Sequence, residues 1–290
     1  MIASEGLPPA YRDTVTGTWT PLAAHIAAHR RTIARPILIG ISGVQGSGKS
    51  TACRFLEHLI GAHGLTAVTL SLDDLYFTRA ERAGLAARVH PLFATRGVPG
   101  THDLVLANHI ITALLTSNGP VAIPRFDKAT DDRAPETTWP IITAPVDILI
   151  FEGWCIGATP QPESALVAPV NALEAAEDAE MTWRTHANAA LADGYARLFA
   201  RIDLCVALRT PDFALVRTWR HTQEQRLRAR SGPAAGMNEA TLDRFIAHFE
   251  RITRHMIATP PPAGAITIHI DRQQTAGAIQ GLDRPAAATG

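Results

Sequence analysis

The chain has 290 residues, of which 46% are hydrophobic and 19% charged, a composition typical of folded globular proteins. Its 27 basic and 27 acidic residues balance to a net charge of zero, which argues against a general nucleic-acid binder or a binder of anionic membrane surfaces. No apolar run approaches the roughly 18 residues of a membrane helix. The start of the chain lacks a secretory signal pattern. Because the three cysteines fit neither a metal motif nor a disulfide framework, we expect a cytoplasmic protein.

Strand-like and helix-like stretches alternate along the chain, which predicts an α/β fold with a mainly parallel sheet. We expect an extended lead-in over 1–20, polar loops over 89–103 and 125–145, and a loosely held tail from about 273. Hydrophobic patterning predicts strands at 36–42, 66–72, 121–124, 146–151, 203–208 and 265–270. It predicts helices at 21–34, 49–61, 78–88, 104–117, 171–200, 211–230 and 238–257.

The most specific motif is GVQGSGKS at 43–50, which fits the pattern G-x-x-x-x-G-K-[ST] between a predicted strand and a predicted helix. Glycines allow successive backbone N–H groups to converge on phosphate oxygens, and the positive end of the helix dipole faces the same anion. The lysine of such a loop reaches the β and γ phosphates, and its Ser hydroxyl ligates Mg²⁺. A chance match in a glycine-rich turn is the alternative. We predict ATP and Mg²⁺ binding through Gly43, Gln45, Gly46, Ser47, Gly48, Lys49, Ser50 and Thr51.

Carboxylates follow two of the predicted strands, at the sheet edge where ligands bind in open α/β sheets. Glu152 ends the strand at 146–151 and could hold Mg²⁺ together with Ser50 and Asp73, or it could pair with a surface Arg. Asp73 and Asp74 end the strand at 66–72, and a carboxylate there could accept the proton of a substrate hydroxyl. Capping of the next turn is the alternative for this pair. We expect one of the two Asp residues to be catalytic and the other to be structural.

Other nucleotide-binding classes are disfavoured by motifs that the sequence lacks. It contains no N-K-x-D guanine-reading motif, no L-S-G-G-Q signature and no Asp-Glu pair after the strand at 146–151. A small-molecule kinase therefore fits the sequence better than a switch or motor protein. Only two of the basic residues are Lys, Lys49 and Lys128, so the second lysine is a candidate for a role that Arg cannot fill.

Two polar loops are dense in groups that recognise carboxylates and hydroxyls, which favours an acidic, hydroxylated small molecule as the acceptor. Solvated loop charges and helix caps are the alternative, and Asp103 could simply cap the helix at 104–117. The residues predicted to bind the acceptor are Asp74, Tyr76, Arg96, Thr101, His102, Asp103, Arg125, Asp127, Lys128 and Trp154.

The predicted helix at 211–230 is rich in arginine, and we interpret the segment of about 211–237 as a mobile lid. An arginine in such a lid can offset the charge of a phosphoryl-transfer transition state. Arg220 and Arg226 are the leading candidates, alongside Lys49 and Asp73, for catalytic roles, although an exposed basic helix face would look the same in sequence.

Six motifs in this order, GVQGSGKST, SLDDLY, RGVPGTHD, IPRFDKA, DILIFEGW and AAGMNEATLDRF, resemble the P-loop type of D-glycerate 3-kinase. This family is related to uridine kinase, phosphoribulokinase and pantothenate kinase. The resemblance covers about 36–272, a P-loop kinase domain preceded by the lead-in and helix at 1–35 and followed by the tail at 273–290. It implies a P-loop NTPase-type three-layer sandwich in which a mainly parallel sheet is flanked by helices.

The resemblance also implies ATP-dependent phosphorylation of D-glycerate to 3-phosphoglycerate. Asp73 would be the general base, and Glu152 the Mg²⁺-associated glutamate. The acceptor side would come from the loops at 89–103 and 125–145 and from an insertion at 153–200. Another hydroxylated acceptor (a nucleoside, a pantothenate-like acid or a sugar phosphate) and a non-catalytic nucleotide-binding module are the alternatives. The oligomeric state does not follow from the sequence.

Overall fold

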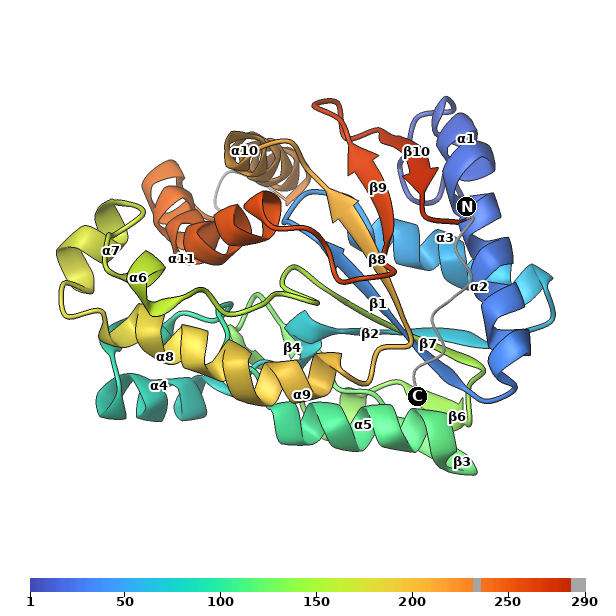
Figure 1. Cartoon of the computed structure of the whole chain (residues 1–290), viewed down its shortest axis with the longest axis horizontal. Coiled ribbons are helices and arrows are strands. Elements are labelled where there is room, and N and C mark those ends of the chain that lie inside the picture. The colour runs from blue at the N-terminus through green and yellow to red at the C-terminus, as the bar shows by residue number, and fades with distance from the viewer. Residues whose placement is uncertain (232–235, 283–290) are drawn as a thin grey trace.

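Six strands form the central sheet, in the order β10–β9–β8–β1–β7–β2 (Figure 1). The computed structural model describes residues 1–231 and 236–282, apart from the side chains of 226, 227, 230 and 231. All neighbouring strands run parallel except β10, which is antiparallel to β9, and this confirms the predicted sheet type. The strands are β1 (Ile37–Gly43), β2 (Ala67–Ser71), β7 (Ile148–Gly153), β8 (Leu204–Arg209), β9 (Ile266–Ile270) and β10 (Ala276–Gln280).

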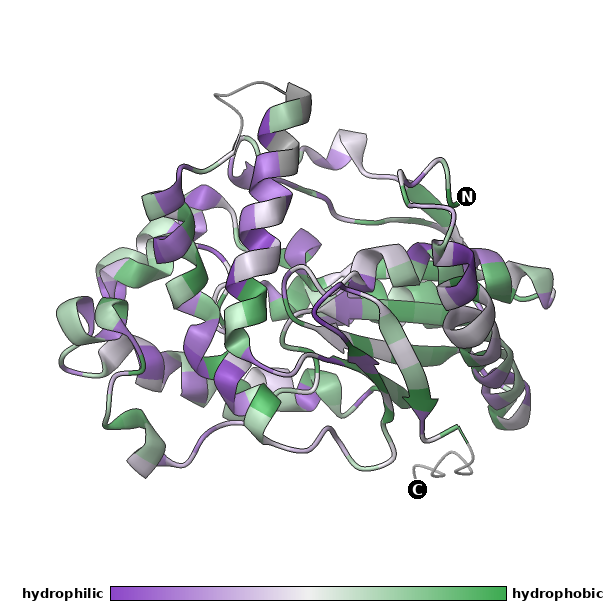
Figure 2. Ribbon diagram, turned by 90° about the horizontal axis from the view of Figure 1, so that it is seen from above, coloured by the Kyte–Doolittle hydropathy of each residue, from purple (hydrophilic) through white to green (hydrophobic). Residues whose placement is uncertain are grey.

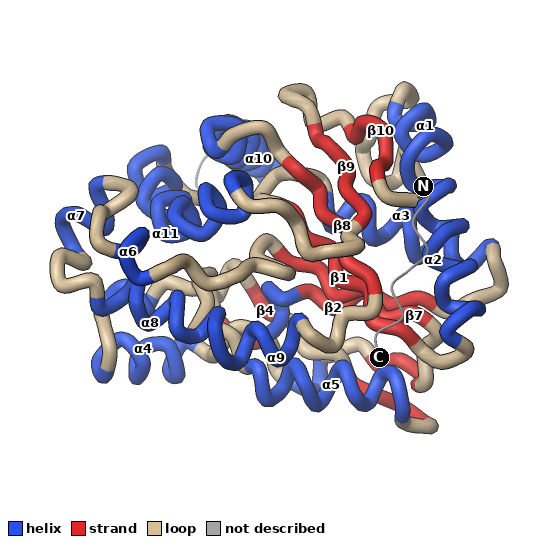
Figure 3. The backbone as a smooth tube through the Cα atoms, viewed as in Figure 1, coloured by secondary structure: helices blue, strands red, loops and turns tan. Residues whose placement is uncertain are grey.

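Helices cover both faces of the sheet, as Figure 3 shows, and confirm the three-layer sandwich. On one face, α2 (Thr20–Ile33), α3 (Lys49–Ala62) and α10 (Phe213–Ser231) pack against alternate residues of the strands. On the other face lie α5 (Leu104–Thr116), α9 (Ala196–Phe199) and α11 (Glu239–Ala258). Hydrophobic residues are concentrated on the central strands in Figure 2. Within the described residues, no helix combines the length and the apolar character that a membrane span requires.

Shorter elements connect these layers. The helices α4 (Arg79–Arg88), α6 (Glu163–Leu166), α7 (Ala172–Glu177) and α8 (Thr182–Ala190) lie in these connections, and π-helix η5 (Leu191–Tyr195) joins α8 to α9. The 3₁₀-helices are η2 (Leu72–Leu75), η3 (Pro91–Ala94) and η4 (Glu136–Thr138). Two small antiparallel sheets pair β3 (Gly119–Ala122) with β6 (Ile141–Ala144) and β4 (Phe126–Asp127) with β5 (Asp132–Arg133).

The two ends of the chain differ from the sequence prediction. The expected extended lead-in over 1–20 is wrong, because α1 (Tyr11–Thr14) and π-helix η1 (Val15–Trp19) lead directly into α2. Apolar residues at 7, 11, 15 and 19 recur every four positions and pack against the core. Within the tail expected to be loose from about 273, residues 276–280 instead form β10, where Ala276 and Ile279 pack against the same core. Residues 283–290 of this tail lie outside the described residues.

Two internal elements also differ. The strand expected at 121–124 pairs with β6 in a separate small sheet and does not join the parallel one. The helix expected over 171–200 is broken at 178–181, where Asp178 accepts hydrogen bonds from the backbone of Trp183 and Arg184 and Met181 has a φ of 60°. Asp178 thus caps a new helix instead of extending the previous one.

Candidate functional site

The phosphate loop joins the end of β1 to the start of α3, as the motif requires. Gly46 and Gly48 have φ values of 82° and 84°, which residues with a Cβ rarely adopt. A Cβ on Gly46 would also lie 2.7 Å from the Cβ of Trp219 in α10. Both glycines are therefore required by the curl of the loop, and Gly46 is also required by the close packing of α10. The loop presents its backbone N–H groups at the N-terminus of a 14-residue helix, where an anion is stabilised.

Glu152 lies where β7 ends, between the phosphate loop and β2. One of its carboxylate oxygens, Oε1, accepts hydrogen bonds from the hydroxyls of Ser50 (3.2 Å) and Ser71 (2.9 Å). Its other oxygen, Oε2, lies 3.9 Å from Nζ of Lys49 and is buried without a hydrogen-bond partner. A buried carboxylate oxygen without a partner, beside a hydroxyl and a phosphate loop, fits a Mg²⁺ ion that takes its other ligands from phosphate and water. The described residues contain no group of three or more His, Cys, Asp or Glu that would hold a metal by themselves.

Asp73 lies in η2, directly after β2, on the side of Glu152 away from β1. Its Oδ1 accepts a hydrogen bond from the Tyr76 hydroxyl (2.8 Å), and its Oδ2 accepts one from Nζ of Lys128 (2.7 Å). Packing around the carboxylate raises its pKa, but the charges of Lys128 and Lys49 and these two hydrogen bonds outweigh that effect. The pKa of Asp73 consequently lies well below its usual range, and the side chain is a carboxylate ready to accept a hydrogen bond.

One cavity of about 590 Å³ brings these groups together at the carboxyl edge of the sheet. It contains seven of the eight residues predicted to bind phosphate and both predicted metal-binding carboxylates. It also contains Asp74, Lys128 and Arg220 among the predicted acceptor and lid residues. The residues from the predicted site that line it are Gln45, Gly46, Ser47, Gly48, Lys49, Ser50, Thr51, Asp73, Asp74, Lys128, Glu152 and Arg220.

The two loops predicted to hold the acceptor are fixed to each other by charged pairs. Asp74 accepts hydrogen bonds from the backbone of Phe126 (3.0 Å) and from the Arg125 guanidinium (3.2 Å). Arg96 pairs with Asp131, and its guanidinium lies 5.3 Å from the centre of the Phe126 ring. Asp74 thus holds the loop 124–131 against η2 through Arg125 and Phe126, and Arg96 joins this loop to the loop at 89–103. The Lys128 side chain extends to the cavity and is 61% exposed.

A buried aromatic chain stands behind Asp73. The Tyr76 ring stacks on His102 with ring centroids 4.5 Å apart, and Nδ1 of His102 is hydrogen-bonded to the Tyr195 hydroxyl. Burial lowers the pKa of His102 to about 3, a shift that the nearby Asp73 charge only partly opposes. His102 is therefore neutral at physiological pH. Tyr76 and His102, both predicted to bind the acceptor, are buried behind Asp73, and Tyr76 hydrogen-bonds to it.

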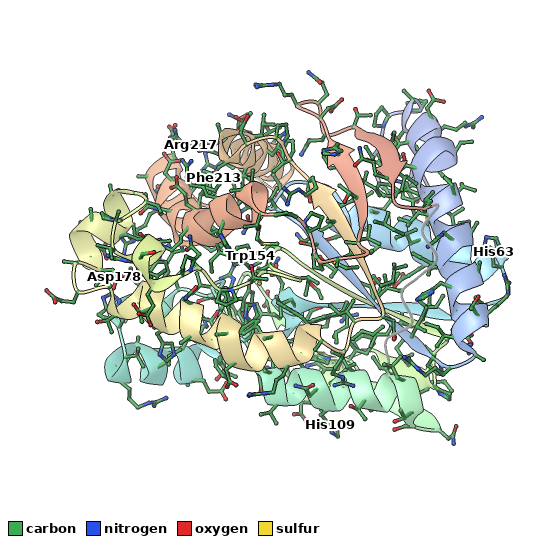
Figure 4. All side chains as sticks on the ribbon, in the orientation of Figure 1. His63, His109, Trp154, Asp178, Phe213 and Arg217 are labelled. Carbon is green, nitrogen blue, oxygen red and sulfur yellow. The ribbon has the colours of Figure 1, made fainter. Side chains whose placement is uncertain are left out.

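Four other residues predicted to bind the acceptor do not line the cavity. The Thr101 hydroxyl is used within its own turn, where it donates to Val98 O (2.7 Å) and accepts from Gly97 N (3.0 Å). Asp103 caps α5 through Leu106 N, the role that the alternative interpretation gave it. Asp127 closes a local turn through Ala129 N and Thr130. Trp154, labelled in the interior in Figure 4, is buried and donates its Nε1–H to Gly97 O (3.0 Å).

The predicted insertion at 153–200 lines none of the cavity in the described structure; instead, it supports the loop at 97–102 through Trp154 and Tyr195. Arg220, in α10, lines the cavity and pairs with Glu224 (2.8 Å) and Gln223 (2.7 Å), and burial lowers its pKa. The side chain of Arg226 lies outside the described residues. A lid movement of α10 stays a prediction.

Sequence reasoning missed several residues of the site. Ser71, which hydrogen-bonds to Glu152, directly precedes the Leu-Asp-Asp run and could have been found as a polar residue at the same strand end. Tyr195, which hydrogen-bonds to His102, lies in a predicted helical segment where no sequence motif marks it as part of the site. The cavity is also lined by residues of the expected extended lead-in and of the expected loose tail, which are Leu7, Tyr11, Trp19, Gln274 and Ala276.

Comparisons with known proteins agree with this geometry. A model of the phosphoribulokinase/uridine kinase family matches residues 38–159, which include the phosphate loop, Asp73 and Glu152. An uncharacterized kinase from Schizosaccharomyces pombe is 35% identical over 227 residues, covering 74% of this chain and 79% of the yeast protein. The chloroplastic D-glycerate 3-kinase of Arabidopsis thaliana is 30% identical over 223 residues, covering 74% of this chain and 46% of the plant protein.

A solved structure shares the fold over nearly the whole chain. The D-glycerate 3-kinase from Cryptococcus neoformans superposes with a TM-score of 0.76 at 24% identity, over 92% of this chain and 98% of that one.

Proposed function

The chain belongs to the phosphoribulokinase/uridine kinase family of P-loop small-molecule kinases, and we propose that it transfers the γ-phosphoryl group of ATP to D-glycerate, giving 3-phosphoglycerate. The observation that carries this proposal is the pairing of Asp73 with Lys128 at the end of the cavity beyond Lys49 and Glu152. A carboxylate that can take a proton and a lysine that can pair with an acid are thereby presented to one small acceptor. Two relatives named D-glycerate 3-kinase support the choice of acceptor.

Asp73 is the proposed general base. Its carboxylate accepts the proton of the glycerate hydroxyl as that oxygen bonds to the γ-phosphorus, and the bond from the γ-phosphorus to the β–γ bridging oxygen breaks. ADP leaves with the electron pair of that bond. Lys49 and Arg220 both line the cavity, and their positive charges offset the charge that develops on the transferred group. Bound Mg²⁺, held by Ser50 and Glu152, would supply charge neutralisation at the phosphates.

Lys128 is the residue best placed to hold the glycerate carboxylate. Among the residues predicted to bind the acceptor, Arg96, Arg125 and Lys128 carry permanent positive charges, and the first two are engaged with Asp131 and Asp74. The Lys128 ammonium is more exposed than either guanidinium and reaches Asp73 across the cavity. A shift of this ammonium from Asp73 to the substrate carboxylate would bring the acceptor hydroxyl beside the base.

A coupled assay of ADP release tests the proposal, with D-glycerate, L-glycerate, uridine, pantothenate and ribulose 5-phosphate as acceptors. We expect strong stimulation by D-glycerate alone, and 3-phosphoglycerate as the product in the phosphorus NMR spectrum. The wild-type reaction without acceptor gives the acceptor-independent background, and the Asp73→Asn variant, assayed in parallel, is expected to lose the stimulation. Stimulation by another acceptor would keep the kinase chemistry and overturn the choice of glycerate, and no stimulation by any would contradict the proposed transfer to these acceptors.

A further inference from the structure

Two adjoining apolar chambers lie on the face of the sheet that α9 and α11 cover. The first chamber has a volume of about 430 Å³ and the second a volume of about 370 Å³, sizes typical of small-molecule sites. Neither chamber shares a lining residue with the cavity that holds Asp73. The chambers are therefore a separate place in the molecule, which the proposed transfer does not use.

The alternation of side chains along β8 creates the first chamber. Val206 and Leu208 pack on the α3 face of the sheet, so Cys205 and Ala207 face the opposite side. On β1, Ser42 is the register partner of Ala207. Ser42, Cys205 and Ala207 line the chamber, and their side chains are too short to fill the space below α11. The sequence thus leaves this part of the sheet without a covering of large side chains.

Prolines form the outer wall. Pro260, Pro261 and Pro262 follow α11 and line the first chamber. Proline has a fixed φ and no backbone N–H, so such a wall is rigid and apolar and contains no donor that needs a partner. A Cβ on Gly157 would lie 3.1 Å from Cγ of Pro262 and 3.8 Å from Sγ of Cys205. These three residues line both chambers, which therefore meet at this narrow point.

The second chamber suits an uncharged group. Leu191 and Phe199, from the η5–α9 segment, give it an apolar wall. Asp203 also lines it, but this carboxylate is already engaged: it pairs with Arg35 (2.6 Å) and accepts a hydrogen bond from the backbone of Leu38 (2.9 Å). An aliphatic chain or an aromatic ring therefore fits this chamber better than a charged group does.

Arg209 places a positive charge at the first chamber. Its guanidinium donates to the carbonyl oxygens of Met256, Ile257 (2.7 Å) and Thr259 (3.0 Å) at the end of α11, which uses three of its five N–H groups. In the part of the chain that the structure describes, its partners include no carboxylate. Carbonyl oxygens carry only partial negative charges, so the guanidinium remains a cation without a counter-ion beside an apolar space.

We propose that the two chambers bind one small amphiphilic carboxylate. Its acid group pairs with Arg209, and its aliphatic chain or aromatic ring lies along Ala207 and past Cys205 into the second chamber. One guanidinium balances one negative charge, which favours a carboxylate over a doubly charged phosphate. The inference is independent of the proposed transfer to D-glycerate, because it uses none of the residues that line the cavity with Asp73.

Calorimetry on the full chain tests the ligand class, with octanoate as the probe. Octan-1-ol keeps the chain without the acid, and acetate keeps the acid without the chain. We expect octanoate to bind at one site per chain, and the other two to bind at least tenfold more weakly. Hexanoate, shorter by two methylenes, should bind about tenfold more weakly than octanoate. The absence of saturable octanoate binding would overturn the site, and equal affinities for octanoate and octan-1-ol would overturn the carboxylate.

Two variants test whether the ligand lies in these chambers. Arg209→Met should weaken octanoate binding about tenfold or more and leave octan-1-ol binding within about twofold. Ala207→Leu extends a side chain into the first chamber and should weaken the binding of both. The matched control is Arg197→Met, an exposed arginine of α9 that lines neither chamber, which should bind octanoate as the wild type does.

Urea denaturation shows whether each variant folds, which matters because Arg209 also contacts the end of α11. Ala207→Leu leaves those contacts in place and fills empty space, so it decides the location of the site even if Arg209→Met does not fold. Wild-type octanoate affinity in Ala207→Leu would overturn the location. An equal loss of octanoate and octan-1-ol in a folded Arg209→Met would overturn the pairing of the acid group with Arg209.

Discussion

The Asp73 carboxylate shows how neighbouring groups can reverse the effect of burial on a single residue. Packing around it raises its pKa, whereas Lys128, Lys49 and the Tyr76 hydroxyl together lower it by more. The Asp73 carboxylate is therefore ionised over the whole pH range in which enzymes work. The same contacts make the carboxylate a weak base until Lys128 moves away, and we expect binding of an acidic acceptor to draw Lys128 toward it.

Substitution of Lys128 tests this coupling. Lys128→Met should raise the KM for D-glycerate about tenfold or more, because the acceptor carboxylate loses its partner. It should also raise the pKa of Asp73, since burial is then opposed by Lys49 and Tyr76 alone. Because Asp73 as the proposed base works only when ionised, the acidic fall of kcat/KM should move to higher pH, which a pH–rate profile from pH 4 to 8 would reveal. Lys128→Arg keeps the charge and should keep the profile. An unmoved profile in Lys128→Met would contradict the coupling.

For single residues, the sequence correctly predicted the positions of those that belong to a motif or follow the end of a strand. Lys49, Ser50, Asp73 and Glu152 meet in one cavity because parallel strands deliver their carboxyl ends to one edge. Hydrogen-bonding partners could not be predicted in the same way. Thr101 binds its own turn. Trp154 reaches back to Gly97, a contact across 57 residues that exists only once the chain is folded.

Elements on the side away from the cavity are joined by a buried ion pair. Arg251 of α11 donates from Nε and Nη2 to Glu174 of α7 (2.7 and 2.6 Å) and also donates to the carbonyls of Ala165 and Ala168. Both side chains of the pair are almost completely buried. The pair therefore fixes α6 and α7 on α11, and loss of one partner would leave the other charge in an apolar surrounding.

Removal of the arginine should be costly. We expect Arg251→Met to lower the free energy of unfolding by about 3–5 kcal/mol, because Glu174 stays buried without its partner. The matched control is Arg197→Met, which breaks the pair with Asp193 between two side chains about 70% exposed. That change should cost less than about 0.5 kcal/mol. Urea denaturation of the two variants and the wild type measures both costs, and equal costs would show that the buried pair does not hold these helices.

Element boundaries were predictable where one signal dominates. The hydrophobic runs of β1 and β7 and the phosphate loop between β1 and α3 appear where the pattern places them. The break at 178–181 depends on Asp178 capping α8, and the pattern of apolar residues alone does not reveal it. Likewise, β10 is short and mostly exposed. Its strand conformation therefore depends on its pairing with β9 and could not be predicted from its amino-acid composition.

At the scale of the whole molecule, the cavity joins the two ends of the sequence to its middle. The sheet brings β2, β1 and β9 into one edge, and residues 7–19 close it beside β10. Composition and periodicity predict the layers but contain no information on which distant segments share a wall. The stability of the folded protein also depends on groups that burial keeps neutral. His102, buried between Tyr76 and Tyr195, is the histidine whose pKa is lowered most among the described residues.

His102 makes the stability of the fold sensitive to acid. Its pKa is about 3 in the folded protein and near 6.5 when unfolded, so between these values the unfolded chain binds a proton that the folded chain does not. Stability is therefore lost as pH falls, by about 2 kcal/mol between pH 7.5 and 5.0 from this group. His102→Gln should be less stable at pH 7.5, because it loses the ring stacked on Tyr76, yet lose about 2 kcal/mol less on acidification.

Urea denaturation at the two pH values measures both effects. The exposed His63, labelled in Figure 4, provides the control. His63→Gln should leave the difference between the two pH values as it is in the wild type, since its ring lies in solvent in both states. Equal acid losses in wild type and His102→Gln would mean that His102 takes up a proton as readily in the folded protein as in the unfolded chain. The His102 ring behind Asp73 would then carry a positive charge at pH 5.0, which would contradict the lowered pKa of His102.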